Sequence, residues 1–132
     1  MQNRKIRIVA VAAAAFVLSA AALARDLAVV SWGGAYQDAQ REVYFKPFME
    51  KTKTTMTEEN WDGGVGTLRA KVQGGNNNWD VVQVESDELL LGCEEGLYEK
   101  LDWAKLGGKD KYMSDAVNDC GVGAIVYSFI LA

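Results

Sequence analysis

Histidine is absent from this 132-residue sequence, which also has only one proline and two cysteines. The absence of histidine removes the commonest proton shuttle near neutral pH and the commonest metal ligand. We therefore expect no cofactor and no metal centre. A carboxylate pair such as Asp62 with Glu85 could act as acid and base in a secreted hydrolase. No nucleophile motif accompanies the pair, so we expect a binding protein and not an enzyme.

Basic residues are scarce beyond the first 24 positions. The sequence has 14 Lys and Arg against 18 Asp and Glu, and three of the bases, Arg4, Lys5 and Arg7, precede residue 25. The remainder is acidic, with a net charge near −7. This balance argues against a nucleic-acid partner, which needs a clustered basic surface. It is compatible with a cationic ligand.

The first 24 residues have the three parts of a secretory signal. A charged start, MQNRKIR, is followed by an apolar run over residues 8–18 and by the small-residue site Ala22-Leu23-Ala24. The uncharged stretch is alanine-rich and falls short of the ~20 strongly apolar residues that span a bilayer. We predict a signal peptide over residues 1–24 that is cleaved after Ala24, which gives a periplasmic protein that we expect to be a monomer.

The two cysteines, Cys93 and Cys120, lie in a chain that is predicted to reach an oxidising compartment. A disulfide between them is the natural hypothesis. Closing a loop of this length would stabilise the fold by roughly 3–4 kcal/mol on the chain-entropy view. Two free, buried thiols are the alternative.

Short apolar runs alternate with amphipathic segments along the chain. We expect strands over residues 27–32, 53–59, 81–84 and within 121–132, and helices over 35–52, 65–73 and from about 86. Pro47 should break the first helix near Phe45 and Lys46. This order predicts an α/β fold with an open, mostly parallel sheet flanked by helices. Because the sequence stops in or just after an apolar strand, we expect the domain over residues 25–132 to be incomplete at its C-terminus.

Aromatic and acidic residues follow the predicted strands. In open α/β sheets, ligands bind beyond the carboxyl ends of the strands. Aromatic faces attract ammonium groups, and carboxylates give them charge-assisted hydrogen bonds. A small cationic ligand would suit this edge, and its candidate binding residues are Trp32, Tyr36, Trp61, Asp62, Glu85, Ser86 and Asp87.

Several of these residues also have purely structural interpretations. Trp32 can cap the core, and Tyr36, on the first helical turn, can pack inward. Ser86 or Asp87 can cap the helix that follows, since both side chains accept hydrogen bonds from free N–H groups. The acids Asp62 and Glu85 can simply be solvated.

Four segments carry a resemblance to a known family: VVSWGGAYQ, WDVVQVESDELL, GCEEGLYEKLDW and DCGVGAIVYSF. Together they resemble the bacterial periplasmic solute-binding proteins of ABC importers, of the spermidine/putrescine-binding type, over residues 26–132. The resemblance implies a fold of two α/β lobes that close on the ligand by a hinge. It also implies ligand contacts for Trp32 and Tyr36 and for Ser86 with Asp87.

On this resemblance, residues 25–132 are the N-terminal lobe of a periplasmic component that captures a polyamine such as putrescine or spermidine. Its partners are the membrane permease subunits of the importer. The sequence departs from the family in lacking nearly all of the second lobe and the acids that the lobe supplies to the amines. Capture of an anionic or metal-chelate solute at the glycine-rich helix starts, and a truncated lobe that binds nothing, are the alternatives.

Overall fold

The computed structural model describes residues 25–75, 77–128 and 130–131. The predicted signal peptide lies outside the described residues, so cleavage after Ala24 stays a prediction. Within the described ranges no helix is both long and apolar enough to cross a membrane. The elements in chain order are β1 (Leu27–Ser31), α1 (Gly34–Gln40), η1 (Arg41–Phe45), α2 (Lys46–Thr52), β2 (Met56–Asn60), α3 (Val65–Gln73), β3 (Val81–Val82), α4 (Ser86–Glu94), η2 (Lys109–Lys111) and η3 (Ser114–Ala116).

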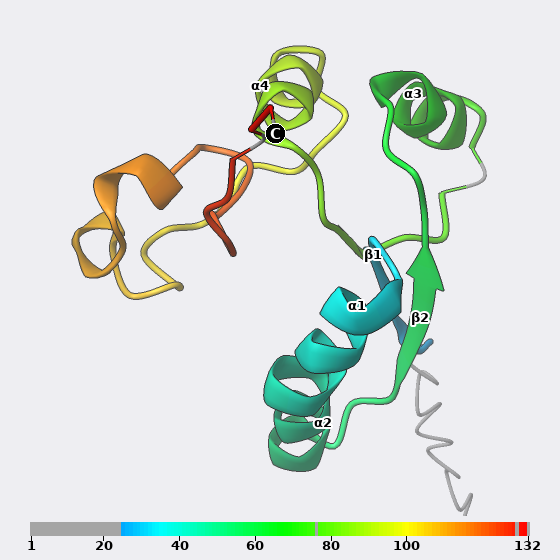
Figure 1. The fold of residues 1–132 in the computed structure, drawn as a ribbon, viewed down its shortest axis with the longest axis vertical. Coiled ribbons are helices and arrows are strands. Elements are labelled where there is room, and N and C mark those ends of the chain that lie inside the picture. Colours follow the sequence, from blue (N-terminus) through cyan, green and yellow to red (C-terminus); the bar gives the residue numbers. More distant parts are fainter. Residues whose placement is uncertain (1–24, 76, 129, 132) are drawn as a thin grey trace, which may run out of the picture.

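A parallel sheet organises the domain, with the strand order β2-β1-β3 (Figure 1). The central strand β1 pairs along its whole length with β2, from Leu27 opposite Met56 to Ser31 opposite Asn60. Its pairing with β3 is confined to Val29 and Val30. As expected of a strand paired on both sides, β1 is almost entirely buried.

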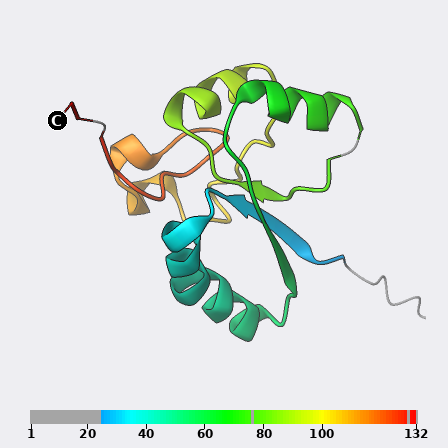
Figure 2. The ribbon, with the colours of Figure 1, turned by 45° about the vertical axis from the view of Figure 1, so that its right-hand side comes forward.

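Helices cover both faces of this sheet. The continuous helical segment from α1 to α2 lies on one side and α3 with α4 on the other (Figure 2). The core is formed by Val30, Trp61 and Leu68, with other apolar side chains packed against them. This arrangement confirms the predicted α/β fold with an open parallel sheet.

The break predicted near Phe45 and Lys46 is a change of helix type at that position. The helical path does not end, but over Arg41–Phe45 it widens to a π-helix before α2 begins. Pro47 then lies in the first turn of α2, where the missing N–H has the least effect. The helix therefore restarts one residue before the proline, as the sequence predicts.

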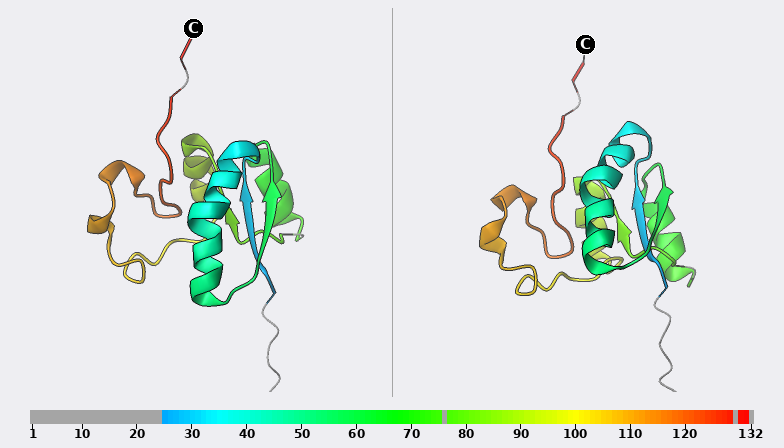
Figure 3. Two further views of the ribbon diagram at one scale, coloured as in Figure 1. Left: turned by 60° about the horizontal axis from the view of Figure 1, so that its bottom comes forward. Right: turned by 90° about the horizontal axis from the view of Figure 1, so that it is seen from below.

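The chain after α4 is mostly irregular, with the two short helices η2 and η3, and it lies beside the layered part (Figure 3). A disulfide between Cys93 and Cys120 ties it to α4, with a Cα–Cα distance of 5.8 Å. Within the segment, Trp103 packs edge-on against Tyr112 at 5.2 Å between ring centroids. The bond between Cys93 and Cys120 confirms the predicted disulfide.

The strand expected within residues 121–132 is wrong in the described part of that range. Only an isolated antiparallel bridge, Val117 with Val122, forms there. Val126 and Ile130 are 90% and 82% exposed. Apolar, β-branched side chains favour a strand only when a neighbouring strand pairs with its backbone, and neither edge of the described sheet does so.

Candidate ligand-binding site

The carboxyl ends of the parallel strands meet at one edge of the sheet, as the sequence predicts. Trp32 follows β1 and Trp61 follows β2, and their indole rings stack with centroids 5.5 Å apart and an interplanar angle of 17°. Trp61 is only 7% exposed and donates from Nε1 to the Gln83 carbonyl at 2.9 Å. Since Trp61 is held in the core, we leave it out of the proposed site.

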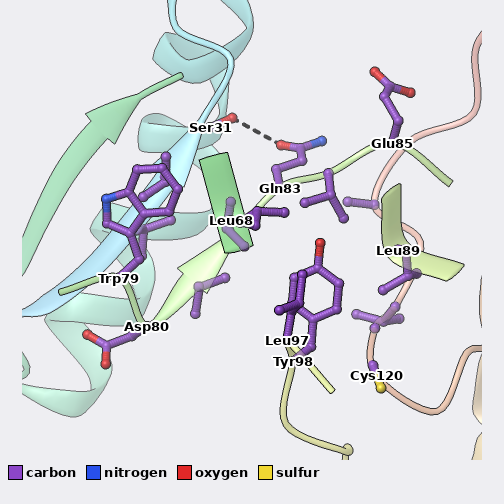
Figure 4. Close-up of a pocket in the computed structure, with 18 of the residues that line it drawn as sticks. Ser31, Leu68, Trp79, Asp80, Gln83, Glu85, Leu89, Leu97, Tyr98 and Cys120 are labelled. Carbon is purple, nitrogen blue, oxygen red and sulfur yellow. Dashed lines mark hydrogen bonds between the residues drawn. The ribbon is translucent and has the colours of Figure 1, made fainter. Parts of the chain in front are cut away.

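Trp32 is half-buried and lines a cavity of about 720 Å³ between β3, α4 and the segment after Cys120. In Figure 4 Ser31 and Gln83 lie in the upper part of the lining and Leu89, Leu97 and Tyr98 lie below them, while the Glu85 carboxylate points away from the other side chains drawn. The indole is therefore neither sealed in the interior nor free in solvent. This is the position that a ligand-facing aromatic requires.

A polar network lies under this cavity at the end of β1. The buried Ser31 hydroxyl lies 2.5 Å from Gln40 Oε1 and 3.0 Å from Gln83 Oε1. Gln40 Nε2 donates to Gln83 Oε1 at 2.8 Å, and Gln83 Nε2 donates to the Tyr36 hydroxyl at 2.7 Å. Tyr36 thus points into this network, which corresponds to its inward-packing alternative.

The start of α4 differs from the expected cap. Glu85, not Ser86 or Asp87, is the N-cap residue, and Glu88 accepts its backbone N–H at 2.9 Å. This is the reciprocal arrangement of a capping box, with a glutamate three residues after the cap. Ser86 and Asp87 occupy the first helical turn with exposed side chains, and Ser86 lines the cavity with Glu85.

Glu88 is a site residue that the sequence reasoning missed. Its carboxylate accepts the N–H of Gly64, in the loop after β2, as well as the N–H of Glu85. The glutamate three residues after a cap was the available signal, but a glutamate at the cap position is not among the preferred N-cap types.

Negative charge gathers where α4 begins. The Tyr127 hydroxyl donates to the Glu85 carboxylate. This hydrogen bond raises the pKa of Tyr127, followed by burial and by the charges of Glu85, Asp87 and Glu88. The potential at this point therefore favours a bound proton, and it would favour an ammonium group for the same reason.

Asp62 is exposed in the loop after β2. It is not among the residues that line the cavity to which Glu85 belongs. Nor does any group of three or more acids and cysteines in the described ranges form a possible metal site.

No known family profile matches the sequence. A search of curated proteins finds the gamma-aminobutyric acid-binding protein of Pseudomonas aeruginosa PAO1, 40% identical over 118 residues. The match covers 89% of this chain and 34% of that protein, so the chain spans about a third of its relative's length.

Solved structures of binding proteins also match part of themselves to this chain. The binding protein MotA of A. tumefaciens B6, in complex with glucopine, matches 72% of this chain and 29% of its own at 26% identity, with a TM-score of 0.65. The binding protein AgtB of A. tumefaciens R10, in complex with agropinic acid, matches 76% and 31% at 31% identity, with a TM-score of 0.68. An ABC transporter substrate-binding protein of Bradyrhizobium japonicum USDA 110 matches 71% and 29% at 30% identity, with a TM-score of 0.66.

The chain is similar to part of several solute-binding proteins, one of which is named as an ABC transporter component. It matches part of their structures, and the single N-terminal lobe stays a prediction. These similar proteins are named for binding and transport, in line with the expectation of a binding protein. The named solutes are gamma-aminobutyric acid, glucopine and agropinic acid, and the spermidine/putrescine type is not singled out.

Proposed function

We propose that this protein is the exported solute-binding component of an ABC importer and that its solute carries an amino group on a short aliphatic chain. The observation that carries the proposal is Glu85, which lines the same cavity as Trp32 and whose carboxylate already accepts a hydrogen bond from a neighbouring hydroxyl. An indole face and a carboxylate together bind the stem and the charge of such an amine.

Two solute classes share this chemistry. A short amino acid such as gamma-aminobutyric acid is favoured by the 40% identity to a protein named for it. Putrescine or spermidine, which the sequence resemblance suggests, would present the same ammonium group to Glu85. A diamine needs a second acidic group for its other end, whereas an amino acid needs a cation or N–H donors there.

The proposal also includes the location and the partners. Removal of residues 1–24 would leave a periplasmic chain that begins at Arg25, with residues 25–132 as the N-terminal lobe. That chain would deliver its solute, as a monomer, to the permease subunits of the importer. Mass spectrometry of exported protein tests the processing, since an N-terminus at Arg25 is expected and one at Met1 would contradict cleavage.

Isothermal titration calorimetry on the protein in its longest natural form tests the solute class. The panel is gamma-aminobutyric acid, putrescine, spermidine, and butyrate as an analogue without the amine. We expect saturable heat with at least one amine and none with butyrate. Binding of butyrate, of another amine-free carboxylate or of a ferric chelate, with no response to the amines, would favour the anionic-solute alternative. No binding at all would favour a lobe that does not bind alone.

A further inference from the structure

The Glu88 carboxylate joins two loops that are far apart in the sequence. One oxygen accepts the N–H of Glu85 at 2.9 Å, at the start of α4, and the other accepts the N–H of Gly64, in the loop after β2. Backbone N–H groups that donate to a carboxylate form charge-assisted hydrogen bonds, which are stronger than neutral ones. The ends of β2 and β3 are therefore connected through one side chain.

Gly63 lies where the residue after β1, Trp32, approaches the Glu88 carboxylate. Its φ of +83° is one that other residues rarely adopt. A Cβ built on Gly63 would lie 3.1 Å from Glu88 Oε1 and 3.4 Å from the Trp32 ring. The absence of a side chain thus lets the carboxylate and the indole approach the same stretch of backbone, and Trp32 follows β1.

Hydrogen bonds from within the protein already satisfy the Glu88 carboxylate. This carboxylate lies in the first turn of α4, where a negative charge is favoured by the helix dipole, and both of its oxygens accept backbone N–H groups. Glu85 also accepts a backbone N–H in the capping box, but it lines the cavity, which Glu88 does not, and its carboxylate meets a side-chain hydroxyl. A solute's ammonium group would therefore pair with Glu85 and leave Glu88 in place.

We propose that Glu88 is a positioning residue that fixes the spacing between Trp32, the loop at residues 62–64 and Glu85, and so sets the affinity for the solute without touching it. This inference rests on the proposed function only for the identity of the solute. The link between the loops can be tested without any ligand.

The first experiment follows the backbone amides of Gly64 and Glu85 by NMR. Glu88→Gln keeps the side-chain volume but replaces one acceptor oxygen by an NH₂ group, and Glu94→Gln makes the same charge change at the other end of α4. We expect the Gly64 or Glu85 amide proton to shift upfield and to exchange at least about tenfold faster in Glu88→Gln only. Unchanged amides in Glu88→Gln, or equal changes in both variants, would overturn the link.

The second experiment compares solute affinity in folded variants. We expect Glu88→Gln to weaken binding of the amine found by calorimetry at least about tenfold, and Glu94→Gln to leave it unchanged. Met49→Ala, on α2 and away from the site, serves as a variant that loses stability only and should keep the wild-type affinity. Equal affinity of Glu88→Gln and wild type would refute the positioning role even if the amides shift. If the wild type binds no amine, the proposed function fails, while the amide result still decides the link.

Discussion

The Trp32 indole, which lines the cavity, stacks on the Trp61 indole, which lies in the core. An aromatic pair of this kind contributes about 0.5–1.5 kcal/mol beyond the area that it buries. The half-buried Trp32 ring is thus oriented by a ring that is buried in the core, and substitutions at the two positions should have different effects.

Trp32→Ala is expected to weaken solute binding at least tenfold at a modest cost in stability, because the indole is half-buried and faces the cavity. Trp61→Ala should instead lower the free energy of unfolding by about 3–5 kcal/mol, the usual cost of removing a large core side chain. Urea denaturation and calorimetry on both variants measure the two effects. A larger stability loss for Trp32→Ala than for Trp61→Ala would contradict this assignment.

Glu85→Gln should weaken binding of an amine by about 10- to 100-fold, since hydrogen bonds to charged groups contribute about 1.5–3 kcal/mol. Glu50→Gln, an exposed acid on α2, is the matched control and should bind like the wild type. Titration calorimetry in low-salt buffer gives both constants. Equal affinity of Glu85→Gln and the wild type would remove Glu85 from the site.

The same substitution has a spectroscopic consequence in the absence of ligand. Because the hydrogen bond to Glu85 is the main cause of the raised pKa of Tyr127, Glu85→Gln should lower that pKa toward the ordinary tyrosine value. Tyrosinate absorbance during an alkaline titration reports this change. The difference should vanish in a Tyr127→Phe background, and its persistence there would assign the shift to another tyrosine.

Reduction of the disulfide between Cys93 and Cys120 should lower the free energy of unfolding by about 3–4 kcal/mol on the chain-entropy view. The effect should be concentrated in the irregular segment that follows α4, because the sheet pairs through its own backbone hydrogen bonds. Urea denaturation with and without reductant measures the total. Amide exchange that accelerates as much in β1 as in residues 100–118 would contradict this localisation.

Acid should destabilise the fold in part through Asp80. Its carboxylate accepts the Ala28 N–H at 2.8 Å and pairs with Arg25, and both contacts lower its pKa. A carboxyl with a lowered folded pKa contributes stability above its unfolded value, about 3.9, and this contribution is lost as the pH falls through the folded value. Asp80→Asn should therefore be less stable than the wild type at pH 7, and the gap should close toward pH 2 in thermal melts. A gap that is constant with pH would contradict this origin.

The sequence predicted the parts of the fold that have strong local signals. The helix over Val65–Gln73 has the predicted limits because glycines flank it on both sides and Val65, Leu68 and Val72 recur at helical spacing. The strand over Leu27–Ser31 was equally clear, since four of its five residues are apolar. Local composition is sufficient to predict a helix or strand when turn residues mark its ends or its side chains form an apolar face.

The sequence-based predictions fail where strand pairing or a long-range contact determines the structure. The apolar run within residues 121–132 looked like a strand, but its state depends on a neighbour that composition does not show. The inward orientation of Trp61 depends on Leu68 and Val30, and the role of Glu88 depends on Gly64, 24 positions earlier. The sequence therefore predicted which candidate residues follow the strand ends, but it did not predict the contacts that support them.

Contact between the solute and the strand-end residues tests the central claim most directly. NMR on the protein in its longest natural form, with the amine that calorimetry identifies, can detect intermolecular Overhauser effects to assigned side chains. We predict that the methylene next to the amino nitrogen gives effects to the Trp32 indole and to Glu85. Effects confined to exposed side chains outside the cavity lining, such as Val43 and Tyr44, or none to Trp32 in a saturated complex, would contradict the account.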